Sequence, residues 1–356
     1  MPTPTIPAGN LYMNATTYTG NGSSSGQAIT NGGTGTSFQP DFVWIKSRSQ
    51  AYNHYDVDSV RGFSGSAARV LQPNLTTAEE TDAANSGGAF KSFNSNGFTV
   101  AQPASGWAGT NENGTTYVGW QWKAGGAAVT NTAGSITSSV SANTTSGFSV
   151  VTATMALSGA QTVGHGLGAA PALIISKDRT QANDWYTYHS ALGNSAYMKL
   201  NTAGVAVTSS PYWNNTSPTS SVFSLGSVFA GVADNLVFYC WAPIAGYSAF
   251  GSYTGNGSAD GPFIYTGFRP KLVMFKAVSG SAYNWDIMDT SRSPYNASNL
   301  ALNQNLSAAE SSPTTIDFLS NGIKIRQSNS GNNNDNGSQY IYAAFAENPF
   351  KYSNAR

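Results

Sequence analysis

The sequence predicts an all-β protein built from tandem antiparallel β-sandwich domains. Short runs rich in β-branched and aromatic residues alternate with turns rich in Gly, Pro and Asn, as is typical of strands. No stretch has the 3.6-residue periodicity of an amphipathic helix. The same landmarks recur in three units of about a hundred residues each, a size that fits one β-sandwich and exceeds the period of a solenoid.

The repeat is clearest where a turn leads into a strand. Residues 18–46 and 253–276 both begin Tyr-Thr-Gly-Asn-Gly-Ser, continue through Phe-x-Pro and end in an apolar run closed by lysine. A degraded third copy is the Gly-Ala-Ala-Pro of 168–171 with the run that ends at Lys177. A proline followed by such a run predicts a buried strand entered through a rigid turn.

An Asp-x-x-Arg motif follows the buried strand in two of the units. It comprises Asp58 and Arg61 in the first unit and Asp289 and Arg292 in the last. The middle unit has His189 in this stretch and no such pair. We interpret both motifs as structural ion pairs beside a turn. Each unit then closes on an aromatic strand, at 117–123, 236–242 and 340–346.

These landmarks divide the chain into an arm, three sandwich units and a linker. The segments are a proline-rich arm at 1–9, unit 1 at 10–124, a Gly/Ser/Thr-rich linker at 125–145, a divergent unit 2 at 146–244 and unit 3 at 245–356. Since no spacer separates the last two units, we expect them to be stiffly coupled and unit 1 to be more loosely tethered.

Two further signals recur in units 1 and 3. Residues 75–80 and 306–310 predict one short helical turn each. Asn-Gly between alternating apolar residues predicts a β-hairpin at 93–100 and another at 318–325.

The composition limits the possible partners and compartments. Only 10% of the residues are charged and the formal net charge is zero, which argues against nucleic acid as a partner. The single cysteine, Cys240, falls in an expected core strand and cannot form an intramolecular disulfide. The N-terminus lacks the pattern of a secretion signal and no run is long enough to span a membrane, so we expect folding in a cytoplasm.

We find no catalytic, metal-binding or cofactor-binding constellation in the sequence. Asp56 with Asp58 and Asp286 with Asp289 are the nearest approach to the paired carboxylates of a glycan hydrolase. The three histidines lack metal-ligand spacing, and the Asn/Asp loops at 258–261 and 332–337 favour solvated turns over a calcium site. We therefore expect a protein that is not an enzyme.

Three aromatic residues in polar loops are candidate glycan contacts. Trp107 and the adjacent Tyr212 and Trp213 lie in Asn-rich stretches where burial is not obvious. A ring flanked by amides offers the apolar face and the hydrogen bonds that a sugar requires. Packing at a subunit contact is the alternative interpretation.

Taken in order, the landmarks resemble the repeated domain of bacteriophage virion proteins. They run from Tyr-Thr-Gly-Asn-Gly through Gly-Phe-x-Pro, the lysine-closed strand, Trp-x-x-x-Asp-x-x-Arg and the Asn-Gly hairpin to the aromatic sequence at 340–352. Unit 3 matches most fully, unit 1 departs at His54 and Tyr55, and unit 2 matches least. Members of that family are tail or fibre proteins with lectin-like, concanavalin-type or jelly-roll sandwiches.

The resemblance implies a virion protein that attaches to a host-surface glycan. It implies docking on other virion proteins through the N-terminal arm, a homotrimeric state, and no cofactor or membrane insertion. A capsid-decoration or head-fibre protein with a purely structural role is the alternative. A glycan depolymerase that uses Asp58 or Asp289 is a third hypothesis.

Overall fold

The computed structural model of the chain describes residues 9–32, 37–82, 89–102, 109–155, 159–209, 211–227, 233–312, 314–328 and 331–347. Within these ranges all pairings between named strands are antiparallel. The helical element there is a 3-10 turn, η1 (Gly9–Leu11). The predicted all-β class is therefore confirmed. No helix in the described ranges has the length and apolarity needed to cross a bilayer.

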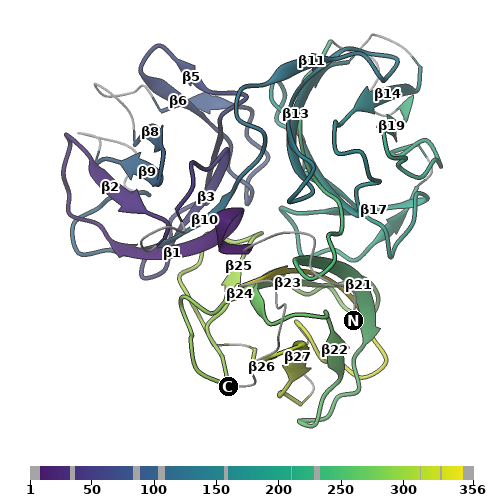
Figure 1. The fold of residues 1–356 in the computed structure, drawn as a ribbon. Helices are drawn as coiled ribbons and strands as arrows, with labels where there is room; N and C mark the ends of the chain where they lie inside the picture. The colour runs from purple at the N-terminus through teal and green to yellow at the C-terminus, as the bar shows by residue number, and fades with distance from the viewer. Residues whose placement is uncertain are drawn as a thin grey trace.

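Three sandwich units surround a common centre (Figure 1). In every unit the closing strand lies between the opening strand and the strand that follows the proline turn. The three central orders are β1-β10-β3, β13-β20-β15 and β21-β28-β23. The same topology in each unit is the structural counterpart of the sequence repeat.

Unit 1 pairs a four-stranded sheet, β1-β10-β3-β4, with two three-stranded sheets, β2-β9-β8 and β5-β6-β7. Its strands are β1 (Met13–Thr19), β2 (Gln27–Thr30), β3 (Phe42–Ser47), β4 (Tyr55–Asp58), β5 (Phe63–Ser64), β6 (Ala67–Val70), β7 (Glu80–Thr81), β8 (Phe90–Asn94), β9 (Gly97–Val100) and β10 (Thr116–Trp122).

Unit 2 has an eight-stranded sheet, β11-β12-β13-β20-β15-β16-β17-β18, and a two-stranded sheet, β14-β19. Its strands are β11 (Val129–Asn131), β12 (Ser138–Asn143), β13 (Phe148–Thr154), β14 (Gln161–Gly164), β15 (Leu173–Asp178), β16 (Tyr186–His189), β17 (Ala196–Lys199), β18 (Val207–Thr208), β19 (Val222–Leu225) and β20 (Asn235–Trp241).

Unit 3 has a five-stranded sheet, β21-β28-β23-β24-β25, and a three-stranded sheet, β22-β27-β26. Its strands are β21 (Ser248–Thr254), β22 (Phe263–Tyr265), β23 (Pro270–Ala277), β24 (Asp286–Asp289), β25 (Leu302–Asn303), β26 (Ile316–Leu319), β27 (Gly322–Ile325) and β28 (Gln339–Ala346). Both predicted hairpins are present, as β8–β9 and β26–β27.

The interpretation of residues 125–145 as a linker is wrong. β11 and β12 lie in this stretch, and β12 pairs with β13 over six residues from Ser138 to Asn143. The stretch lacks large side chains, yet the small Ser, Val and Ala residues suffice for an outer pair of strands that takes its stability from the backbone ladder. Residues 125–145 therefore extend unit 2. Of the predicted arm at 1–9, residues 1–8 lie outside the described residues.

The central strands of each large sheet are buried on both faces. In β3, Phe42 and Trp44 belong to a core that all three units share, whereas the alternating Val43 and Ile45 belong to the core of unit 1 alone. Period-two alternation thus sends one set of side chains to the sandwich interior and the other set to the neighbouring units. This double burial explains why the lysine-closed runs are continuously apolar.

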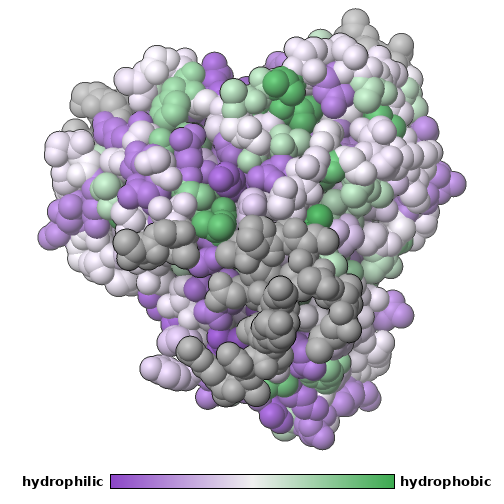
Figure 2. Space-filling model, in the orientation of Figure 1, coloured by the Kyte–Doolittle hydropathy of each residue, from purple (hydrophilic) through white to green (hydrophobic). Residues whose placement is uncertain are grey.

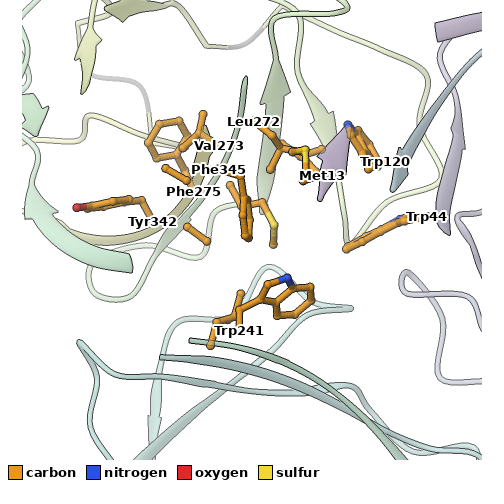
Figure 3. Close-up of a cluster of buried hydrophobic side chains, with 14 of the residues drawn as sticks. Met13, Trp44, Trp120, Trp241, Leu272, Val273, Phe275, Tyr342 and Phe345 are labelled. Atoms are coloured by element: carbon orange, nitrogen blue, oxygen red, sulfur yellow. The ribbon is translucent and has the colours of Figure 1, made fainter. Parts of the chain in front are cut away.

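Three equivalent aromatic residues meet at the centre. Strand register makes Trp122, Trp241 and Phe345 equivalent, because they pair with Phe42, Leu173 and Leu272 at the same place in each unit. Ring centroids are 5.8 Å apart for Trp122 and Trp241, 5.7 Å for Trp122 and Phe345, and 6.4 Å for Trp241 and Phe345. Figure 3 shows side chains of all three units converging on this point.

Unit 1 is not loosely tethered, contrary to the expectation. Its Met13, Trp44 and Trp120 lie in the same buried cluster as the β23 and β28 side chains of unit 3. Tyr12, at the start of unit 1, also packs edge-on against Tyr247 at a centroid distance of 6.3 Å. The small residues of 125–145 suggest a loose connection, but they carry no information about the apolar outer face of β10, which holds unit 1 against the other units.

The shared core predicts that the three units unfold together. Replacing Trp241 by Ala removes contacts with units 1 and 3, and we expect a loss of about 3–5 kcal/mol in the free energy of unfolding, within one cooperative transition. Denaturant titration followed by fluorescence and circular dichroism measures both. Val129→Ala, at a 65% exposed side chain, is the control and stays within about 0.5 kcal/mol. Separate transitions for the units would contradict this picture.

Candidate functional site: the junctions between the units

The two Asp-x-x-Arg motifs form closed turns at the ends of β4 and β24. Asp289 accepts hydrogen bonds from its own Arg292, at 2.6 Å from Nε and 2.9 Å from the backbone N–H. Asp58 and Arg61 make the same two contacts. All four side chains in these ion pairs have zero exposure. A buried ion pair needs further hydrogen bonds to offset its desolvation, and the neighbouring units supply them.

Each turn is bonded to the closing strand of the next unit. Trp120 Nε1 in unit 1 donates to Asp289 Oδ2 at 3.0 Å, and the Tyr239 hydroxyl in unit 2 donates to Asp58 Oδ2 at 2.9 Å. His189 occupies the corresponding position of unit 2, and its Nε2 donates to the Tyr342 carbonyl in unit 3 at 3.1 Å. Unit 2 therefore replaces the carboxylate acceptor of the other two turns by a donor, His189.

Two glutamates join these turns to a second strand of the neighbouring unit. Glu310 binds both Arg292 of its own unit and Arg48 of unit 1, each at 2.8 Å. Glu79 binds Arg61 at 3.3 Å and Arg179 of unit 2 at 2.8 Å. Glu79 also binds Arg69 at 3.1 Å, so three arginines converge on Glu79 and two on Glu310. Burial of both carboxylates shields these contacts from salt.

The predicted helical turns at 75–80 and 306–310 are absent. Neither segment is helical. The Glu79 N–H donates to the Arg179 carbonyl of unit 2, and the Glu310 N–H donates to the Arg48 carbonyl of unit 1, each at 2.8 Å. These bonds between units replace the hydrogen bonds within a helix on which the prediction rested.

The third junction is apolar where the other two are ionic. The Ala206 N–H donates to the Val278 carbonyl at 3.3 Å, the same backbone bond found at the other two junctions. Alanine and valine therefore stand where glutamate and arginine stand elsewhere. The backbone contact is kept in all three junctions, and the ion pair in two.

A ring N–H crosses each junction next to this bond. Trp185 Nε1 donates to the carbonyls of Gln72 and Leu75, at 3.2 and 3.1 Å. Trp285 Nε1 donates to the Lys199 carbonyl at 3.0 Å. In unit 1 this place belongs to His54, whose Nε2 donates to the Asn303 carbonyl at 2.9 Å. Burial lowers the pKa of His54 to about 3, so the ring is neutral and its Nδ1 accepts from Trp44 at 2.7 Å.

The lysine that closes each apolar run is buried and bonded to carbonyls. Lys46 Nζ donates to the Ser47 carbonyl at 2.8 Å, and Lys276 Nζ donates to the Ala203 carbonyl of unit 2 at 2.9 Å. Desolvation lowers the pKa of Lys46 to about 7, and lowers those of Lys177 and Lys276 to about 8. These groups titrate near neutral pH without being exposed.

The carboxylate pairs do not form a hydrolytic site in this structure. Asp56 and Asp58 are each 1% exposed, and Asp286 and Asp289 are fully buried. Burial raises the pKa of Asp286 to about 6, and its oxygens already accept from Asn303 and Thr314 at 2.6 Å. A glycan cannot reach either pair. Among the residues that the structure describes, no group of three or more His, Cys, Asp or Glu side chains could hold a metal ion.

A surface depression at the passage from unit 1 to unit 2 has a carboxylate whose hydrogen bonds are already made. It has a volume of about 480 Å³ and lies where unit 1 passes into unit 2, around Asp41 and Lys123. The Asp41 carboxylate accepts from the Ser59 hydroxyl at 2.9 Å and from the Ala124 N–H at 2.7 Å. These bonds fix the passage between the units and occupy the carboxylate.

The structure describes two of the three candidate glycan contacts, and the two differ in burial. Trp213 is 1% exposed and packs against Tyr188 in the core of unit 2, so the expectation of an exposed ring is wrong there. Tyr212 is partly buried and packs on Tyr197 at a centroid distance of 3.8 Å. Trp107 lies outside the described residues. Trp213 lies among polar residues in the sequence, but its own side chain points into the core of unit 2.

The match to known families covers nearly the whole chain. The model of a family described as "Domain of unknown function (DUF7483)" matches residues 8–349. No curated protein and no solved structure matches. The matched region contains all three units, in agreement with their shared core.

The junction ion pairs predict a large cost for removing one partner. Asp289→Ala leaves Arg292 buried without its nearest carboxylate and removes the acceptor of Trp120, so we expect a loss of about 3 kcal/mol or more in the free energy of unfolding. Arg269→Ala, in an ion pair whose side chains are 28% and 32% exposed, is the control and costs below about 1 kcal/mol. Equal costs in denaturant titrations would show that the junction pairs contribute no more than surface pairs.

The buried lysines predict that stability rises with pH from about 7 to about 10. In this window the unfolded chain binds more protons than the folded one, because the folded pKa values of about 7 and 8 lie below the ordinary value of 10.5. Thermal melts from pH 6.5 to 9.5 test this. In Lys46→Met the rise is shallower, whereas Val129→Met, at a 65% exposed residue without a titrating group, leaves it unchanged. A pH profile that is the same in Lys46→Met and the wild type refutes the assignment.

Proposed function

We propose that this chain, which belongs to the DUF7483 family, is a non-enzymatic structural component of a bacteriophage virion, a tail fibre or tail-associated adhesin that presents its sandwich units to a host-surface glycan. The observation that supports this most directly is the single core shared by the three units. A body of this kind holds its outer loops and sheets in fixed relative positions, which favours display over turnover.

The distribution of charge agrees with a displayed protein. Charged residues are few, and several of the buried ones, Arg61, Arg292, Glu79 and Glu310, lie inside the junctions. The exterior is therefore left mainly to Ser, Thr, Asn and Gly, in the mixture of weakly and strongly hydrophilic residues seen in Figure 2. Such a surface offers hydrogen-bonding groups to neutral ligands and little attraction for polyanions.

The resemblance of the repeat to phage tail and fibre proteins supports the location. Docking through the arm at 1–9 and assembly as a homotrimer belong to this proposal. Several copies on one particle would strengthen binding that is weak at each site. A head-decoration or head-fibre role uses the same rigid body without a glycan.

Labelling of intact virions distinguishes these roles. We expect antibody against the chain to label the tail or its fibres in electron micrographs of phage particles that encode it, and the purified chain to adsorb to host cells. Labelling of the head without adsorption favours decoration. Absence of the chain from purified particles by mass spectrometry overturns the virion assignment. Release of reducing sugar ends from host glycan by the purified wild-type chain would instead establish a depolymerase.

A further inference from the structure

The exposed aromatic side chains of the described residues gather on one small sheet. Three large aromatic side chains there are more than a third exposed, Phe263 at 47%, Tyr265 at 56% and Tyr295 at 84%. Phe263 and Tyr265 lie on β22, the edge strand of the β22-β27-β26 sheet of unit 3. This sheet forms the outer end of unit 3, farthest from the shared core in Figure 1.

The three residues flank both edges of that sheet. Phe263 and Tyr265 are two positions apart on β22 and point to the same face, with the buried Ile264 between them pointing inward. Asn296 exchanges two hydrogen bonds with the backbone of Phe318 in β26, at 2.9 and 3.1 Å, and so places the adjacent Tyr295 beside the opposite edge. The sheet between them is two strand spacings wide, about 10 Å, and Tyr295 lies beyond its β26 edge.

Gly322 makes room for a ring on this face. It lies opposite Tyr265 in the register of β22 and β27. A Cβ atom at Gly322 would lie 2.9 Å from Cζ of Phe263 and 2.2 Å from the Ile264 carbonyl oxygen. The Phe263 ring therefore extends over the bare backbone of Gly322, which holds the ring against the sheet while nearly half of it stays open to solvent.

The other two units show that the fold does not require these aromatic residues. Register with β9 puts Ala28 and Thr30 of unit 1 where unit 3 has Phe263 and Tyr265. Thr162 and Gly164 stand there in unit 2. The inward residue between them is apolar in every unit, as Ile29, Val163 and Ile264. Packing of the sandwich core therefore explains why the inward residue is apolar in all three units. It does not explain why the two outward residues are aromatic in unit 3.

Paired charges surround the rings. Lys324 lies opposite Phe263 and binds Asp260 at 2.6 Å, and the Asp260 side chain is 85% exposed. Lys324 lowers the pKa of Asp260, which keeps the carboxylate ionised at neutral pH. On β26, Asp317 lies opposite Lys324 and binds Arg326 at 2.5 Å. Both pairs are neutral overall, and both present donors and acceptors beside an apolar surface.

We propose that this platform, defined by Phe263, Tyr265 and Tyr295, binds a neutral hexose-containing oligosaccharide. The apolar C–H faces of sugar rings pack on the aromatic rings, and their hydroxyls exchange hydrogen bonds with the Asp260–Lys324 and Asp317–Arg326 pairs. The proposal rests on the adhesin function proposed above and places the glycan contact in unit 3, away from Tyr212 and Trp213.

Other occupants fit less well. The three partly exposed rings offer roughly 300–450 Å² of aromatic surface, given about 150–250 Å² for a whole ring side chain. A stable protein interface needs about 800 Å² from each partner, so a second copy or another protein is too large for this patch alone. A nucleic acid or an acidic glycan requires an excess of positive charge, and both charge pairs here are neutralised.

Binding of the full chain to a printed array of neutral and uronic-acid-containing oligosaccharides tests this. The variant Phe263→Ala with Tyr265→Thr copies the residues of β2 at the same positions, so the strand remains compatible with the fold. We expect it to lose roughly tenfold or more in apparent affinity for neutral oligosaccharides. Tyr295→Ala is a second variant at a surface loop and weakens binding by a smaller factor. Val207→Ala, at a 43% exposed residue of unit 2, is the matched control and binds as the wild type does.

The outcomes separate this inference from the function on which it rests. If the wild type binds neither arrayed glycans nor host cells, the adhesin function fails. If the wild type binds neutral glycans and both aromatic variants bind equally well, the adhesin function stands and the platform is wrong. Binding confined to acidic oligosaccharides overturns the ligand class. Self-association that the aromatic variants abolish identifies the patch as a contact between copies.

Discussion

The fold depends on burying both faces of three sheets around one aromatic centre. A sandwich normally leaves the outer face of each sheet to water, and that face is then polar. Here the outer faces of the three large sheets carry Phe42, Trp44, Trp120 and their equivalents, which can be buried only against the other units. The contact of Trp122, Trp241 and Phe345 is where these faces meet. No unit could expose that surface alone without a large apolar patch.

The junctions show which parts of this arrangement are constrained. Each keeps one backbone hydrogen bond between units and one ring N–H donor to a carbonyl, although the ring belongs to Trp185, Trp285 or His54. In two junctions the turn carries an Asp, and its carboxylate accepts a hydrogen bond from a Trp or Tyr on the closing strand of the next unit. Where unit 3 has Ala343 at that position of the closing strand, the turn carries His189 and the direction of donation reverses. Buried polar groups must be paired, but several chemical combinations satisfy them.

The sequence was sufficient for the fold class and for many of the strands, and insufficient for the contacts between the units. Alternation, proline turns and Asn-Gly hairpins are local signals, and they predicted the fold class and the units. The packing of unit 1 on unit 3 depends on contacts such as Trp120 with Asp289, 169 residues apart, which no local pattern encodes. Residues 125–145 appeared to be a linker because their strands are stabilised by pairing and not by large side chains. Trp213 appeared exposed because its neighbours are polar, while its own ring fills the unit 2 core.

Comparison of the three units separates the positions that the sandwich requires from those that it does not. Positions that the sandwich needs are apolar in all three units, as at Ile29, Val163 and Ile264. Positions that form the ion pair in two junctions change together in the third, where Ala206 and Val278 replace the glutamate and the arginine. Phe263 and Tyr265 fit neither class, because they are outward, solvent-exposed and confined to one unit. A residue type that costs solubility and adds nothing to the common fold is best explained by a ligand, and the neutral charge pairs beside it restrict what that ligand is.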